Sequence, residues 1–121
     1  MRVMMIVKAT EDSEAGVLPT REQFAEMGKY NDELAKAGLL LAADGLRPSS
    51  EGARVVFAGG APSVIDGPFS EIGELMAGYW VIRVDSMDAA FDWAKRIPFR
   101  DGVVELRRIY EESDFPAESA E

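Results

Sequence analysis

Three residues whose side chains can transfer protons or bind anions stand at the ends of predicted strands. Asp44 and Asp66 each precede a glycine, and Arg47 precedes a proline. Glycine and proline interrupt regular pairing, so these side chains are free to face a cleft. A carboxylate near an arginine can bind or deprotonate a small polar molecule, while the guanidinium stabilises developing negative charge. We therefore take Asp44, Asp66 and Arg47 as candidate catalytic residues.

The same three residues also have structural interpretations. Asp-Gly sequences commonly form turns in which the aspartate side chain accepts a backbone hydrogen bond, which favours turn capping for Asp66 and is an equal alternative for Asp44. Arg47 could pair with either acid at the surface, an interaction that contributes little to stability. The sequence leaves both interpretations open.

A second group of polar residues is predicted to bind a ligand. Arg83 interrupts an otherwise apolar strand, and Tyr79 shares its face by the two-residue period of a strand. If that face looks into the interior of a dimer, the guanidinium there needs a carboxylate or a bound anion, so an interface salt bridge is the alternative to a ligand role. Asn31 lies beside the apolar stripe of the first long helix. It is either a rim residue of the same cavity or a hydrogen-bonded core residue.

The chain contains neither histidine nor cysteine. This excludes thiolate catalysis, histidine general bases and the usual ligands of zinc and haem. Glu71 and Glu74 have a spacing that could serve a hard cation, but a solvated acidic surface is the simpler interpretation without a third ligand. We expect no metal and no cofactor, so any catalysis must use carboxylates, tyrosine, lysine or arginine.

Composition limits the partners of the protein. The chain has 121 residues, enough for one domain, and a formal net charge of −9. This charge would repel a nucleic acid and an anionic membrane. No apolar run approaches the roughly 20 residues of a membrane span. The start of the chain has no basic leader with a cleavage site, so we expect a soluble, cytoplasmic protein.

The hydropathy pattern predicts two strand-helix-strand units with a hairpin between them. Gly59-Gly60, which tolerates positive φ, predicts the turn of that hairpin. Thr20 and Gln23 form a capping box for a first helix that ends near Gly38. Ser70 could cap a short helical turn over 71–76 after the hairpin. The expected strands cover 3–7, 39–43, 54–58, 63–65, 79–84 and 103–110, with a loop over 10–16 and a second helix from about 87 to 97. This order predicts an α+β fold, the ferredoxin-like split βαβ arrangement with an inserted hairpin. We place the domain at 1–110 and an acidic tail at 111–121.

Two strands predict a dimer. Residues 3–7 and 79–84 are apolar on both faces, apart from Arg83. Two helices can cover only one face of the sheet, so a second copy of the same sheet is the simplest cover for the other face. We therefore predict a homodimer with sheets packed face to face, a dimeric α+β barrel.

Several short motifs are spread over most of the chain. The tetrapeptide DGPF occupies 66–69 and is followed by Ser-Glu-Ile. The other motifs are VKAT at 7–10, MGKYN at 27–31, AG at 37–38, GLRPS at 45–49, GYW at 78–80 and WA at 93–94. Together they resemble the YCII-related superfamily, specifically its DGPF-domain branch. The resemblance implies the same dimeric α+β barrel.

The resemblance says little about activity. Some relatives look like small-molecule enzymes with a histidine–aspartate pair, and this chain has no histidine early in its first helix or at Arg47. Others look linked to extracytoplasmic-function sigma factors, which implies a regulatory role. We therefore expect a small-molecule-binding or regulatory accessory dimer with a small polar or anionic ligand. The alternatives are a cofactor-independent lyase or isomerase using aspartate and arginine, and a structural interaction module.

Overall fold

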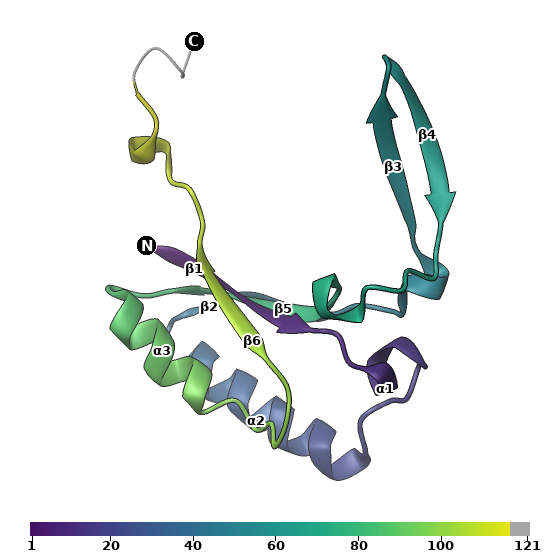
Figure 1. Ribbon diagram of the computed structural model, residues 1–121. Helices are drawn as coiled ribbons and strands as arrows, with labels where there is room; N and C mark the ends of the chain where they lie inside the picture. The colour runs from purple at the N-terminus through teal and green to yellow at the C-terminus, as the bar shows by residue number, and fades with distance from the viewer. Residues whose placement is uncertain (117–121) are drawn as a thin grey trace.

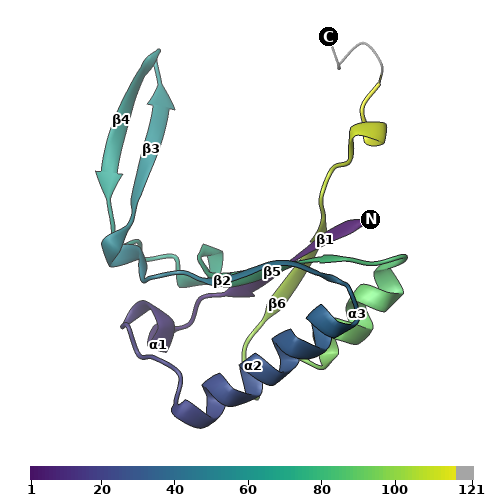
Figure 2. The ribbon, with the colours of Figure 1, turned by 180° about the vertical axis from the view of Figure 1, so that it is seen from behind.

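A four-stranded antiparallel sheet with two helices on one face forms the body of the molecule. The computed structural model describes residues 1–116. The strand order is β2-β5-β1-β6, with bounds Leu40–Gly45, Met76–Arg83, Arg2–Lys8 and Val104–Arg108. The main helices, α2 (Arg21–Lys36) and α3 (Met87–Lys95), both lie under the same face (Figure 1; Figure 2). The predicted α+β class is confirmed.

The helix boundaries follow from side chains that satisfy free backbone groups. The Thr20 hydroxyl accepts a hydrogen bond from the Gln23 amide at 3.1 Å, and the Gln23 side chain accepts one from the Thr20 amide at 2.8 Å. This confirms the predicted capping box of α2. Gly38, just beyond its end, has φ of +75°, a conformation that glycine adopts at little cost. Ser86 caps α3 by accepting from the Ala89 amide at 3.1 Å.

The hydrophobic core lies between the sheet and the two helices. Met5, Leu34 and Ile82 are fully buried in it. Two polar side chains at this interface have partners: the Trp80 indole donates to the Asn31 side chain at 2.7 Å, and the Tyr30 hydroxyl donates to the Trp93 carbonyl at 2.7 Å. The core therefore joins both helices to the central strand β5.

A separate two-stranded hairpin projects from the body. Its strands are β3 (Ala53–Ala58) and β4 (Ala61–Asp66), and all twelve of their residues are exposed. The turn is Gly59-Gly60, with φ of +62° and +82°, as the sequence predicted. The hairpin rises on the side of the sheet opposite α2 and α3 (Figure 1; Figure 2). We call it the arm.

Several local expectations differ from the structure, and the strand bounds shift by one to three residues. The expected loop after β1 contains a helical turn, α1 (Glu11–Glu14), because Thr10 and Ser13 cap each other. The expected turn over 71–76 shrinks to the 3-10 turn η2 (Ile72–Glu74), without a side-chain cap, since β5 already starts at Met76. The last strand ends at Arg108 rather than 110.

The segments outside the sheet and main helices complete the described chain. The 3-10 turn η1 (Ser49–Glu51) precedes the arm, and η3 (Glu112–Asp114) lies in the expected tail. The last five residues of that tail, 117–121, lie outside the described residues. No helix within 1–116 has the length and apolar character needed to cross a membrane.

Candidate functional site

Asp44 and Tyr79 meet on the face of the sheet that the helices leave open. They are register partners in β2 and β5, and the Tyr79 hydroxyl donates to Asp44 Oδ2 at 2.9 Å. This hydrogen bond and the charge of Asp44 raise the pKa of Tyr79 above its ordinary value, because both favour the neutral phenol. The pair combines residues that the sequence assigned to two groups.

Arg47 lies just beyond β2, but its partner is neither of the predicted aspartates. Its guanidinium pairs with Glu51 Oε1 at 3.2 Å, four residues further along the chain. The side chain is 83% exposed, so this ion pair is screened by water and contributes little to stability. The guanidinium is therefore free to exchange Glu51 for another anion.

Arg47 also lines a shallow cavity of about 490 Å³ at the base of the arm, which is largely open to solvent. The arm supplies Arg54, whose guanidinium carbon lies 3.7 Å above the centre of the Phe69 ring, a cation–π contact. No carboxylate within the described residues forms an ion pair with Arg54. The other lining residues are mostly apolar or small: Leu46, Pro48, Ser49, Glu51, Gly52, Ala53 and Leu75.

A hydrogen-bonded junction around Ser49 holds the base of the arm in place. Glu14 accepts from the Ser49 amide at 2.9 Å and also from its hydroxyl. The Ser49 hydroxyl in turn accepts from the Phe69 amide at 3.0 Å. The Gly67 amide donates to the Gly52 carbonyl at 3.0 Å. The junction therefore ties α1, η1 and the chain after the arm together beside the cavity.

Asp66 ends β4, opposite Ala53. Its side chain is exposed, and the structure, as far as residue 116, gives it neither a turn-capping hydrogen bond nor an ion pair with an arginine. It does not line the cavity. Both sequence interpretations of Asp66 therefore remain without a supporting contact.

The remaining predicted ligand residues lie elsewhere. Arg83 is exposed at the far end of β5, four residues or about 13 Å from Tyr79 along the strand. It is close enough to Glu111 to help lower the pKa of that carboxyl, although the hydrogen bond from Arg2 is the larger cause. Asn31 lies on the helix side of the sheet, and its side-chain oxygen is occupied by Trp80. The core interpretation of Asn31 is thus supported.

The six predicted residues therefore do not form one constellation. Asp44 and Tyr79 form a pair, Arg47 lines the cavity, and the other three lie apart. Sequence reasoning missed Arg54, Phe69 and Ser49. A usable signal for Arg54 was present, because it is the only charged residue in the strand ARVVFA.

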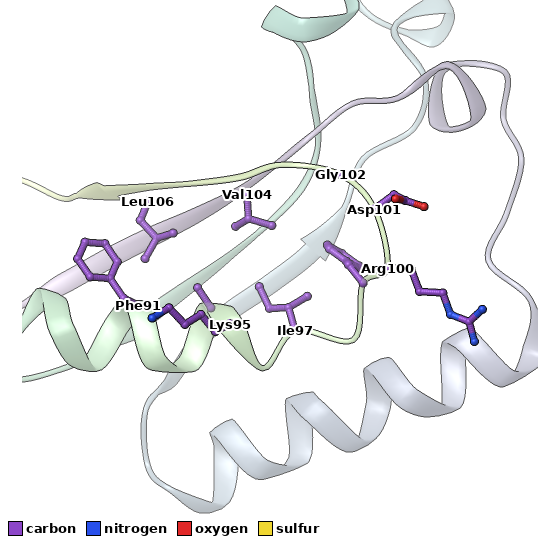
Figure 3. Close-up of a pocket in the computed structure, with 10 residues that line it drawn as sticks. Phe91, Lys95, Ile97, Arg100, Asp101, Gly102, Val104 and Leu106 are labelled. Carbon is purple, nitrogen blue, oxygen red and sulfur yellow. The ribbon is translucent and has the colours of Figure 1, made fainter.

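A second cavity of about 420 Å³ lies between α3 and β6. Phe91 from the helix faces Val104 and Leu106 from the strand across this space (Figure 3). Lys95, Arg100 and Asp101 contribute charges at its border. Within residues 1–116, no three acidic side chains are grouped as metal ligands would be.

A comparison with known protein families covers the part of the chain that holds these features. The model of the YCII-related domain matches residues 1–113. The chain belongs to the YCII-related domain family. No curated protein matches it significantly. The matched residues include both cavities, the arm and all six predicted site residues, and the match itself indicates no specific function.

Proposed function

We propose that this YCII-related protein binds a small organic anion in the cavity between Arg47 and Arg54. The observation that carries the proposal is the Arg54 guanidinium, which lies 3.7 Å from the Phe69 ring without an ion-pair partner in the described chain. A chain with a net charge of −9 offers many acids to pair with an arginine. An arginine that instead lies on an aromatic ring beside a cavity is well placed to bind an anion from outside.

The chemistry of the lining indicates the class of ligand. Among the lining residues themselves, two guanidiniums and one carboxylate, Glu51, leave an excess of positive charge. A guanidinium can bind a carboxylate through two parallel hydrogen bonds, which makes it selective for planar anions. Leu46, Pro48 and Leu75 offer apolar surface for the rest of the molecule, and the volume of about 490 Å³ is typical of small-molecule sites. A monocarboxylate with an apolar or aromatic part fits best.

The finer assignment of the fold belongs to the same proposal. Each main helix connects two strands that have a third strand between them, which supports the ferredoxin-like split βαβ arrangement of the DGPF-type branch. Met4, Ile6 and Val81 are only half-buried on the open face. Face-to-face packing with a second sheet would bury them, as a dimeric α+β barrel requires. We propose this dimer as the functional form, with an accessory or regulatory role.

Calorimetric titration with benzoate, with benzamide as the uncharged analogue, tests the ligand proposal. We expect benzoate to bind, benzamide to bind at least tenfold more weakly, and Arg54→Gln to lose benzoate binding. Arg21→Gln, at the exposed start of α2, is the matched control and should bind like the unmodified protein. Equal binding of benzoate by both variants, or binding by neither the protein nor its variants, would refute the proposal.

The second candidate is a cofactor-independent lyase or isomerase, favoured by the 2.9 Å contact between Tyr79 and Asp44. Asp44 would act as the base and the phenol of Tyr79 would hold it in position. The protein should then promote exchange of the methyl protons of pyruvate in heavy water, observed by NMR. Asp44→Asn should abolish this exchange. Absence of exchange in the unmodified protein leaves binding as the function.

A further inference from the structure

The arm exposes more apolar surface than an isolated hairpin can keep in water. Phe57 is 80% exposed and Val64 is 68% exposed, and Val55, Val56 and Ile65 are exposed as well. The register places Val55 opposite Val64 and Phe57 opposite Pro62, so these four side chains share one face. No charged residue lies between Arg54 and Asp66.

A surface of this kind needs a cover. A two-stranded hairpin alone is marginally stable in water, and a flat apolar edge without charges is prone to pair with other chains. The body of the protein does not supply the cover, because every residue of β3 and β4 remains exposed in the single chain. Another molecule must bury this face.

We propose that the arm docks on a second copy of this chain, so that two copies exchange arms around their packed sheets. The inference rests on the dimer in the proposed function and extends it by a second contact. The arm and the open face of the sheet lie on the same side of the molecule (Figure 1; Figure 2). A two-fold axis that brings two open faces together therefore also directs each arm toward the other copy.

The dimensions agree with this arrangement. Packed sheets lie about 10 Å apart, whereas strands of six residues extend about 20 Å. An arm that starts beside its own sheet would consequently reach past the plane of the partner's sheet. Its apolar face would then lie along the partner's flank instead of in solvent.

The area needed for a stable dimer also favours the arm. Four strands of about seven residues present a face of roughly 450 Å². A standard interface buries about 800 Å² from each partner. One face of the arm adds roughly 200 Å², and each copy both gives and receives an arm. The sheet face and the two arms together reach the area of a standard interface, about 800 Å² for each partner, whereas the sheet face alone does not.

The charges on the open face of the sheet allow a second copy to approach, despite the net charge of −9 on each chain. Strand alternation places four basic residues and two acidic residues on the open face: Arg2, Lys8, Arg83, Arg107, Asp44 and Glu105. Lys8 and Arg107 both contact Glu105, at 3.6 and 3.2 Å. The contacting surfaces thus avoid the acidic excess, which lies elsewhere on the chain, and two copies can approach without strong repulsion.

Sedimentation equilibrium over a range of concentrations tests the proposal with the full chain. The double substitution Phe57→Ser and Val64→Ser removes the apolar face of the arm, and we expect it to weaken dimerisation at least a hundredfold. Phe24→Ser is the matched control, since Phe24 is also an exposed phenylalanine, 59% accessible, but lies on α2. The control should dimerise like the unmodified protein. Far-UV circular dichroism must show both variants folded, which is expected because the arm contributes nothing to the core.

The outcomes separate the arm from the sheet contact. If the arm variant dimerises as tightly as the unmodified protein, the arm proposal is refuted and the sheet-to-sheet dimer stands. If the unmodified protein is still monomeric at a concentration on the order of 100 micromolar, both the sheet contact and the arm contact are refuted. The ligand proposal is judged separately by benzoate binding. Because the chain has no cysteine, Phe57→Cys accepts a single spin label. Should the arm variant fail to fold, the label still decides the question: immobilisation that disappears on dilution to the monomer supports docking, and a freely rotating label at all concentrations overturns it.

Discussion

Replacing Gly67 by alanine should damage the junction that holds the arm. A Cβ at Gly67 would overlap the carbonyl oxygen of Ser49 and lie 2.7 Å from its carbon atom. Both are backbone atoms, so no side-chain rotation can relieve the overlap. The chain must move by more than an ångström, which breaks the hydrogen bonds from Gly67 to Gly52 and from Phe69 to Ser49, both 3.0 Å long.

The expected loss follows from these contacts. Overpacking a tight site costs about 1–3 kcal/mol, and each partly exposed hydrogen bond adds roughly 0.5–1 kcal/mol. The resulting loss of about 2–5 kcal/mol in the free energy of unfolding corresponds to a fall in Tm of roughly 8–20 °C for a chain of this size. Urea unfolding, followed by tryptophan fluorescence at fixed protein concentration, measures the change directly.

Two glycines provide controls for this experiment. At Gly73 and Gly28 an added Cβ would have no neighbouring atom within 4 Å, and neither glycine has a positive φ. Gly73→Ala should change stability by less than about 0.5 kcal/mol. Gly28→Ala, inside α2, should raise stability by up to about 1 kcal/mol. A Gly67→Ala protein that unfolds within about 2 °C of the unmodified protein, with unchanged amide shifts at 67–69, would refute the reasoning.

Three further predictions concern buried or paired side chains. Burial raises the pKa of Tyr30 from its ordinary 10 to about 12, so its contribution to stability is complete below pH 10 and is lost as the pH rises toward 12. Between pH 10 and 12 the free energy of unfolding should fall more steeply with pH for the unmodified protein than for Tyr30→Phe. Asn31→Leu leaves the Trp80 indole without an acceptor and should cost about 1–3 kcal/mol, with a shifted tryptophan emission; an unchanged midpoint would contradict this. The hydrogen bond from Arg2 lowers the pKa of Glu111, so Glu111→Gln should be less stable than the unmodified protein at neutral pH, and acid titration should abolish the difference as Glu111 protonates.

Much of the fold was predictable because local signals agreed with tertiary packing. The capping box at Thr20, the left-handed Gly38 and the Gly59-Gly60 turn each specify backbone geometry within a few residues, and the structure has all three. Helix α1 was missed because its four residues bury nothing and show no periodicity. Its signal is the reciprocal capping of Thr10 and Ser13, which is visible in the sequence only as two small polar residues.

The candidate site was less predictable because it depends on contacts between distant segments. Asp44 and Tyr79 are 35 residues apart and meet only through the register of β2 and β5. Sequence spacing correctly placed Tyr79 and Arg83 on one strand, but could not show that Arg83 lies at its far end near Glu111. Arg54 appeared to be an ordinary strand residue until the chain after β4 brought Phe69 beneath it.

The junction at Ser49 is also the point about which the arm would rotate relative to the body. The junction consists of a few hydrogen bonds, whereas the strands beyond it extend about 20 Å. A rotation of about 10° at the base therefore moves the tip of the arm by roughly 3.5 Å. The two arginines of the cavity lie on opposite sides of this junction, since Arg47 belongs to the body and Arg54 to the arm. A molecule that draws the two arginines together would rotate the arm about the junction, and the displacement would be largest at the Gly59-Gly60 turn, far from where the molecule binds.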